Sequence, residues 1–313
     1  MISGFCIHQG GLAQTLPADF TRAFFIQRFF RIYPPWLSAV LVAVLVSHAA
    51  GRPVETGEWV RHLTLTNGFF NDYRLNPVFW SVSVEFCLYL LYPAWLALRR
   101  RHGLPLAMSA SVLISILSSV VCWSIQPTPA GPARWFFLNV WCGWLAGALL
   151  AEWRHTGAGW LTRPTWWLGG GLVIGLHALA TATGLYQGAA AYAALPITIM
   201  LSIWPLSLFL HVGDRLGARS GPALLAPLWR WLAIVGGFSY SLYLLHVPVQ
   251  SLVYRLLPHL STGPAKALLL ALWLGVVLLA SWLHFLAIER PAARLGRRLV
   301  ERTRQLRPAG HAA

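Results

Sequence analysis

Charged residues are scarce in this sequence, and their scarcity limits the class of protein. Asp, Glu, Lys and Arg together make up 11% of the 313 residues, whereas soluble proteins average about 25%. Hydrophobic residues make up 57%, and the mean hydropathy is +0.59. This composition argues against a soluble chain and indicates a protein that lies in a membrane.

Several long runs contain no charged residue at all: 32–51, 104–133, 164–213, 231–254 and 267–288. Each is near or above the roughly 20 residues with which an α-helix crosses a bilayer. The sequence therefore predicts an all-α, polytopic helical membrane bundle with about eight full spans and one partial N-terminal helix. We expect a membrane domain over residues 1–289 and a basic cytoplasmic tail over residues 290–313.

Proline and glycine indicate where these helices begin and where they pack. Pro34 and Pro35 predict the start of a span at about residues 35–50, after a short amphipathic helix, because the first amides of a helix need no partner. A further span is expected at about 232–254. Close helix packing is predicted at two GxxxG pairs, Gly143 with Gly147 and Gly171 with Gly175.

The motifs of soluble enzymes and of metal sites are missing. The sequence contains no P-loop, no HExxH and no GxSxG. Its four cysteines form no CxxC and no Cys/His metal spacing, so we expect them to pack in the core and predict no metal site. The cysteines are Cys6, Cys87, Cys122 and Cys142.

Acidic residues are especially few, with 9 Asp and Glu against 24 Lys and Arg, and the net charge is +15. In a soluble protein this charge would suggest nucleic acid, but in a membrane protein it suits loops against an anionic leaflet. If the connector holding Arg28 and Arg31 is cytoplasmic and the sides alternate, 18 basic residues lie inside and 6 outside. The positive-inside rule then predicts that the 51–79 loop is outside and the C-terminus is cytoplasmic.

Trp80–Pro93 is apolar enough for a membrane helix but contains Glu85. Ser81, Glu85 and Tyr89 are spaced by four and share one helix face. A carboxylate in hydrocarbon is costly, so Glu85 is expected to face the bundle interior. It is either a functional residue or a structural one that is paired with an arginine or hydrogen-bonded to a neighbouring helix.

A second polar stripe is formed by Ser239, Tyr243 and His246, which are spaced by four and three. A lone histidine in a bundle is more often structural than catalytic. Counted along their helices, Glu85 and His246 both fall in the outer half of the membrane. We therefore expect them to line one polar cavity, as candidate catalytic residues. Candidate substrate-binding residues are their stripe neighbours Ser81, Tyr89, Ser239 and Tyr243.

Arg28 and Arg31 are three residues apart beside the membrane and share a helix face. A pair of guanidinium forks suits phosphate groups, which makes both arginines candidates for binding a phosphorylated substrate. Anchoring to lipid headgroups is the alternative.

Blocks along the chain resemble those of one family. Ile2–Phe5 resembles its ISGFLI helix end, Arg28–Pro34 its RRxxRIxP connector, and Trp80–Glu85 its WSLSVE block. Ser239–His246 resembles SYSLYLxH, and Ile288–Pro291 resembles the closing IERP. In these blocks and their order the chain is similar to the membrane acyltransferase-3 family, bacterial O-acyltransferases of surface glycans.

The resemblance implies about ten membrane helices in a bacterial cytoplasmic (inner) membrane protein. It implies transfer of an acyl group, often acetyl, from cytoplasmic acyl-CoA to a glycan or lipid-linked sugar across the membrane. Acyl-CoA would be the donor substrate, and no cofactor would be bound permanently. The family's catalytic histidine lies on its first membrane helix, about ten residues after an arginine, and neither has a counterpart here. The chain as given is therefore expected not to catalyse acyl transfer. Phe86 also stands where the family often has a second glutamate.

Two other functions remain open on the sequence. Sparse intramembrane ionisable groups also mark transport paths, so a small-molecule exporter or permease is one alternative. Neither duplicated halves nor paired broken helices, the signs typical of transporters, are found in the sequence. A non-catalytic remnant of the acyltransferase family is the other alternative.

Overall fold

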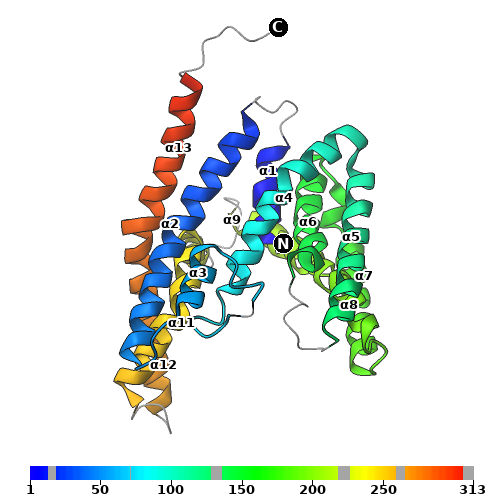
Figure 1. The fold of residues 1–313 in the computed structure, drawn as a ribbon. Coiled ribbons are helices and arrows are strands. Elements are labelled where there is room, and N and C mark those ends of the chain that lie inside the picture. Colours follow the sequence, from blue (N-terminus) through cyan, green and yellow to red (C-terminus); the bar gives the residue numbers. More distant parts are fainter. Residues whose placement is uncertain (13–18, 71, 128–135, 218–225, 259–264, 306–313) are drawn as a thin grey trace. The chain divides into compact units, whose positions relative to one another are not determined.

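The computed structural model describes residues 1–12, 19–70, 72–127, 136–217, 226–258 and 265–305 (Figure 1). Within these ranges the regular elements are all helices, which confirms the all-α prediction. The helices are α1 (Ile2–Gly11), α2 (Phe20–Ala49), α3 (Thr56–Leu63), α4 (Trp80–His102), α5 (Leu104–Ile125), α6 (Phe137–His155), α7 (Pro164–Ala182), α8 (Ala189–Met200), α9 (Ile203–Gly217), α10 (Ala226–Gly237), α11 (Ser239–Leu256), α12 (Ala265–His284) and α13 (Arg290–Gln305).

Fewer helices than expected meet the length and hydropathy of a membrane span. Five stretches of the described residues qualify: Phe20–Ala49, Trp80–His102, Leu104–Ile125, Ala190–Arg215 and Ala265–Gln305. A sixth is reached if the bent pair Arg230–Gly237 and Ser239–Leu256 crosses as one span. The structure therefore supports a membrane protein with several spans, and the expected count of about eight is not confirmed.

The chain divides into two compact units, each made from two stretches of sequence. The first unit contains residues 1–16 and 84–229, and the second contains residues 17–83 and 230–313. Helix α4 contributes its first residues to the second unit and the remainder to the first.

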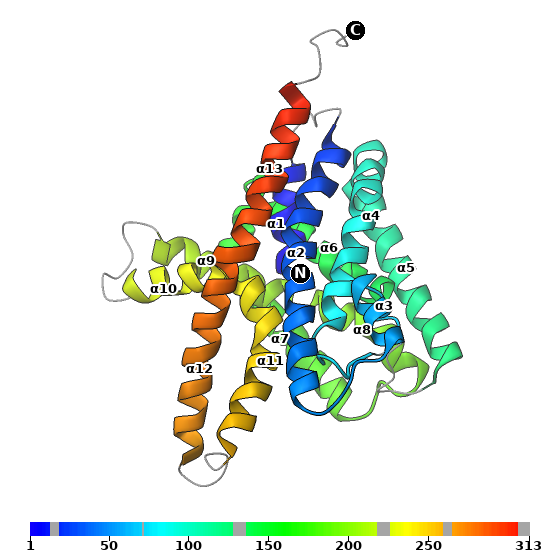
Figure 2. The ribbon, with the colours of Figure 1, turned by 60° about the vertical axis from the view of Figure 1, so that its left-hand side comes forward.

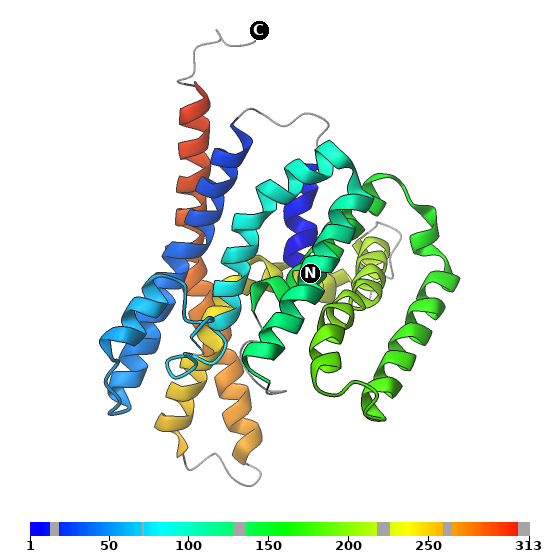
Figure 3. The ribbon, with the colours of Figure 1, turned by 45° about the vertical axis from the view of Figure 1, so that its right-hand side comes forward.

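The core of the first unit forms around α6, which packs against α1, α5 and α8. A Cβ on Gly147 would lie 2.1 Å from the Met1 carbonyl oxygen, and one on Gly143 would lie 2.1 Å from Cγ2 of Ile199. The first GxxxG pair therefore allows the close approach that was predicted. At both glycines of the second pair, on α7 (green in Figure 3), a Cβ would meet nothing within 4 Å among the described residues, so no such packing occurs there.

In the second unit, α2 and α13 lie side by side (Figures 1 and 2), and α11 packs against both α2 and α12. A Cβ on Gly296 would lie 2.8 Å from Cβ of Phe30, which shows how closely α13 approaches α2. Helix α2 is continuous for 30 residues and contains Pro34 and Pro35 in its interior. The predicted helix start at these prolines is therefore wrong. Helices within a bundle tolerate interior proline because their neighbours compensate for the lost hydrogen bonds.

The span expected at 232–254 is not one continuous helix, because the chain bends by 74° between Arg230–Gly237 and Ser239–Leu256. The two helices together still have the length and hydropathy of one span. Two consecutive glycines, Gly236 and Gly237, precede the bend, and glycine is a weak helix former. The Ser239 hydroxyl donates to the Gly236 carbonyl across the break, at 2.9 Å. Because the helix breaks here, α11 begins at Ser239 with a helix N-terminus of its own.

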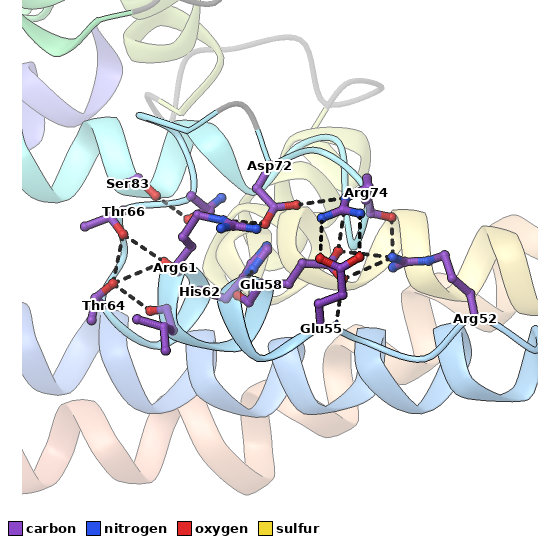
Figure 4. Close-up of polar contacts among 12 residues, drawn as sticks. Arg52, Glu55, Glu58, Arg61, His62, Thr64, Thr66, Asp72, Arg74 and Ser83 are labelled. Carbon is purple, nitrogen blue, oxygen red and sulfur yellow. Dashed lines mark hydrogen bonds and ion pairs between the residues drawn. The ribbon is translucent and has the colours of Figure 1, made fainter.

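At the other end of α2, ion pairs surround the short helix α3 (Figure 4). Arg52 donates to Glu58 at 3.0 Å, and Arg61 Nε donates to Asp72 at 2.8 Å. Arg74 Nε lies 3.5 Å from the same Glu58 carboxylate, whose side chain is fully buried. A buried carboxylate is stabilised by such partners, so Arg52, Glu58 and Arg74 fix the loop on α3.

We expect the second unit to lose stability as the pH falls below about 6.5, the ordinary histidine value. Burial lowers the pKa of His62, whose Nδ1 donates to the Glu58 carbonyl at 2.8 Å. The folded state thus binds a proton less readily than the unfolded state, and stability present above pH 6.5 is lost on acidification. Thermal unfolding measured between pH 7.5 and 5.5 should show this loss in the parent and less of it in His62→Phe. The exposed-histidine variant His48→Phe should retain it, and equal pH dependence in all three proteins would contradict the assignment.

Candidate functional site

A pocket of about 420 Å³ in the second unit has four arginines in its wall. This volume lies within the range of small-molecule sites, about 300–1,000 Å³. Glu289 is the single acidic residue among the described residues that line it. The lining residues are Arg31, Gly237, Phe285, Glu289, Arg290, Ala293, Arg294 and Arg297. A wall with this charge would attract an anion.

Three helices position the arginines and the polar groups of the pocket. Arg290, Arg294 and Arg297 are spaced by four and three on α13, so they share one face. The close contact of α13 with α2 brings Arg31 to the same pocket. Gly237 lies just before the N-terminus of α11, where the positive end of the helix dipole also favours negative charge.

Behind the pocket wall, a buried chain of hydrogen bonds joins α11, α12 and α2. Both the amide and the hydroxyl of Ser241 lie within hydrogen-bonding distance of Glu289 Oε2, at 3.2 and 2.6 Å. His284 Nδ1 lies 2.8 Å from the Ser241 hydroxyl, and His284 Nε2 lies 2.6 Å from the Ser38 hydroxyl. Ser241, His284 and Glu289 are each less than 10% exposed. This chain fixes the carboxylate in the pocket wall.

The structure separates the two predicted phosphate-binding arginines. Arg31 lines the pocket. Arg28 is not among the described lining residues, and its guanidinium carbon lies 5.6 Å from the centre of the Phe24 ring. The pocket geometry therefore favours Arg31 over Arg28 as the residue facing a ligand.

In the first unit, Glu85 accepts a hydrogen bond from the hydroxyl of Tyr89 on the same helix. Tyr89 also lies 3.1 Å from the Ser3 hydroxyl, to which Trp144 Nε1 donates at 3.1 Å. The predicted Glu85 and Tyr89 stripe thus forms one hydrogen-bonded group with α1 and α6. Among the described residues, no arginine pairs with Glu85.

The other predicted polar residues lie in the second unit. The hydroxyls of Ser81 and Tyr243 are 2.5 Å apart, which brings one residue of each predicted stripe together. His246 Nδ1 donates to the Tyr243 carbonyl at 2.8 Å, and Ser239 is exposed. Glu85 and His246 belong to different units, so their shared cavity stays a prediction.

Comparison with known proteins decides the family. A model of the acyltransferase-3 family, described as an acyltransferase domain, matches residues 1–287. The chain belongs to this acyltransferase family. It is also similar to acyltransferase MdmB of Streptomyces mycarofaciens, with 26% identity over 326 aligned residues that cover 90% of this chain and 76% of the relative. No solved structure matches.

Within this acyltransferase, three of the blocks noted in the sequence contribute to the arginine pocket or to the hydrogen-bonded chain behind it. Arg31 comes from the connector block, Ser241 from the SYSLYLxH block, and Glu289 with Arg290 from the closing block. Ser241 and Glu289 were not predicted as site residues. The available signal was Glu289 itself, an acidic residue next to a long apolar run.

Sequence analysis also missed a buried polar cluster in the first unit. His8 is fully buried, with Nδ1 3.0 Å from the Tyr92 hydroxyl and Nε2 2.7 Å from Glu152 Oε1. Arg99 donates to the other oxygen of Glu152, also at 2.7 Å. His8 has no exposed surface that a substrate could reach, so the cluster fastens α1, α4 and α6 together. Glu152 within an apolar stretch was the signal for it.

Proposed function

We propose that this acyltransferase moves an acyl group, most simply acetyl, from acyl-CoA to a hydroxyl of an extracytoplasmic glycan or lipid-linked sugar. The observation that carries the donor assignment is the arginine-lined pocket in a chain of an acyltransferase family. Acyl-CoA serves as a substrate and no permanently bound cofactor is required. We propose that the protein lies in the bacterial cytoplasmic membrane with its C-terminus in the cytoplasm, where acyl-CoA is available.

Coenzyme A carries several phosphate groups, and the pocket supplies matching chemistry. Guanidinium forks bind phosphate oxygens in pairs, with charge-assisted hydrogen bonds about twice as strong as neutral ones. The N-terminus of α11 adds amide dipoles that point in the favourable direction. The Arg31 assignment of the sequence is thereby extended to Arg290, Arg294 and Arg297 on α13.

Acyl transfer to a hydroxyl also needs a group that takes the hydroxyl proton. The intramembrane residues Glu85 and His246 are proposed for this step. Glu85 already accepts a hydrogen bond from a tyrosine hydroxyl, as it would from a sugar hydroxyl. The acceptor is proposed to contact the neighbouring polar side chains Ser81, Tyr89, Ser239 and Tyr243.

Membranes containing the protein, incubated with acyl-CoA radiolabelled in the acyl group, test the proposed function. The proposed function predicts that label passes from acyl-CoA into envelope glycan or lipid-linked sugar, and that it does not do so in membranes without the protein. The sequence-based expectation that the chain as given does not catalyse transfer predicts no labelled product, so this experiment decides between the two. Uptake of a small molecule without acylation would instead indicate a permease. The absence of both transfer and uptake would leave a non-catalytic role.

The proposed orientation predicts that the α3 loop and the end of α13 lie on opposite sides of the membrane. The basis is the 18 to 6 distribution of basic residues. Gly57 and Glu301 are both exposed, and single cysteines placed there should react with an impermeant maleimide from opposite sides. Both substitutions belong in a background without the four native cysteines. Labelling of both positions from the same side would overturn the orientation.

A further inference from the structure

In the hydrogen-bonded chain behind the arginine pocket, the distances indicate which atom carries each hydrogen. The Ser38 hydroxyl is 2.8 Å from the Pro35 carbonyl oxygen. Two oxygens at this distance need a hydrogen between them, and only Ser38 can supply it. His284 Nε2, at 2.6 Å from the same hydroxyl, must then carry a hydrogen and donate it.

The same reasoning applies to the two contacts of the Ser241 hydroxyl. It lies 2.6 Å from Glu289 Oε2 and 2.8 Å from His284 Nδ1, and each contact needs one hydrogen. Ser241 owns one hydrogen and can supply one contact only. The second hydrogen belongs either to His284 Nδ1 or to the Glu289 carboxyl. Glu289 and His284 together therefore hold one proton more than a carboxylate and a neutral imidazole would.

The two positions of this proton give the pocket different charges. With the proton on His284, the pair is an imidazolium and a carboxylate. With the proton on Glu289, both groups are neutral, and the number of hydrogen bonds stays the same. Of these two residues, Glu289 is among the described residues that line the pocket and His284 is not. The position of the proton therefore decides whether the arginine wall contains a negative charge.

We propose that Glu289 is a further binding residue of the pocket, and that it becomes a neutral carboxylic acid when a phosphate group enters. The Nδ1–H bond of His284 breaks and its hydrogen passes to the Ser241 oxygen, while the Ser241 hydroxyl hydrogen passes to Glu289 Oε2. The imidazolium becomes neutral imidazole, the carboxylate becomes a carboxylic acid, and no proton is taken from solvent. That this phosphate belongs to acyl-CoA rests on the proposed function.

The driving force is the repulsion between two anions in one pocket. A carboxylate beside an incoming phosphate is disfavoured, as like charges that share a site always are. The charged groups that share the wall with Glu289 are Arg31 from α2 and Arg290, Arg294 and Arg297 from α13. The α12 neighbour is His284, and the α11 neighbour, Ser241, does not titrate. Moving the proton removes the negative charge of Glu289 from the arginine wall, which then presents only positive charge to the phosphate.

Calorimetric binding of coenzyme A to the full chain in lipid nanodiscs tests the proposal. Titrations at pH 8 in two buffers of different ionisation enthalpy give the number of protons taken up per bound coenzyme A. At this pH a phosphate monoester with a second pKa of about 6 is fully ionised, so it contributes little. The parent should take up almost none. His284→Gln removes the stored proton, so its uptake should rise by about one proton relative to the parent.

Two further variants separate this role from a structural one. Glu289→Gln imitates the neutral acid and should bind coenzyme A at least as tightly as the parent, with no proton uptake. His48→Gln changes an exposed histidine of the same unit and should match the parent. Equal proton uptake in the parent and His284→Gln, with coenzyme A bound, would overturn the proposal and leave a structural clamp.

If His284→Gln does not fold, infrared difference spectra of the parent and Glu289→Gln decide the question. Addition of coenzyme A should produce a carboxylic acid band in the parent that Glu289→Gln lacks, and the absence of this band in the parent would refute proton transfer. Failure of coenzyme A to bind the parent would refute the donor of the proposed function. Inorganic pyrophosphate is then the probe in the same titrations, and its failure to bind as well would refute the anion pocket and this inference.

Discussion

Replacing Arg31 with alanine is expected to lower kcat/KM for acyl-CoA by about 10- to 100-fold. Arg31 is exposed and lines the pocket with three arginines of α13, so its guanidinium would contact a phosphate group of the proposed donor. Hydrogen bonds to charged groups contribute about 1.5–3 kcal/mol, and about 1.4 kcal/mol corresponds to a factor of ten. Most of the loss should appear in KM, measured as the rate of radiolabelled acyl transfer against acyl-CoA concentration.

Three variants make the Arg31 result interpretable. Arg31→Lys should restore only part of the activity, because an ammonium cannot form the paired contacts of a guanidinium. Arg298→Ala removes an exposed arginine of α13 that is not among the lining residues and should behave as the parent. Arg28→Ala should weaken donor use less than Arg31→Ala. Equal activity of Arg31→Ala and Arg298→Ala would exclude the pocket as the donor site.

Replacing Glu152 with alanine is expected to destabilise the first unit by about 3–5 kcal/mol, the usual cost of removing one partner from a buried ion pair. Glu152 has 6% of its side chain exposed and joins His8 to Arg99, each at 2.7 Å. Without it, Arg99 loses its carboxylate and the fully buried His8 loses a hydrogen-bond partner. Thermal unfolding of the parent and the variant in the same detergent measures the loss.

An exposed ion pair in the same unit provides the control for Glu152. Arg154 and Asp214 are 2.8 Å apart, but their side chains are 35% and 60% exposed. Exposed pairs contribute about 0–1 kcal/mol, so Asp214→Ala should change stability little. If Glu152→Ala and Asp214→Ala unfolded at the same temperature, the cluster would not stabilise the packing of α1, α4 and α6.

Local sequence patterns predicted structural features that depend on residues close together in the sequence. The spacing of Glu85 and Tyr89 predicted that they share one helix face, and the structure shows a hydrogen bond between them. The sequence singled out Arg31 as a phosphate-binding candidate, and it lines the pocket, although it lies inside α2 and not at the helix end that was expected there. Gly143 and Gly147 predicted close helix packing, because a residue without a side chain allows two backbones to approach.

Contacts between distant parts of the chain could not be predicted in this way. His8 and Glu152 are 144 residues apart, and Ser241 and Glu289 are 48 residues apart. Helical periodicity shows which face of a helix is polar but not which other helix that face meets. The arginine pocket combines residues from α2, α10 and α13 with the short helical segment Phe285–Glu289 between α12 and α13, so it required the packing of these helices.

The chain path at proline and glycine was also misjudged, for a physical reason. Proline usually ends or begins a helix, but α2 continues through Pro34 and Pro35 with α11 and α13 packed along it. Conversely, the apolar run 231–254 contains no charge that would mark a break, yet the helix bends at Phe238. Hydropathy reports the medium around a segment and does not report its local geometry.

Binding of radiolabelled acetyl-CoA to the purified chain in lipid nanodiscs tests the central claim most directly, since it needs no acceptor. The arginine pocket predicts saturable binding that unlabelled coenzyme A displaces. It also predicts that the double variant Arg31→Ala/Arg294→Ala loses this binding, while Arg298→Ala retains it. Binding that is unchanged in the double variant, or that coenzyme A does not displace, would contradict the assignment of this pocket to the acyl donor.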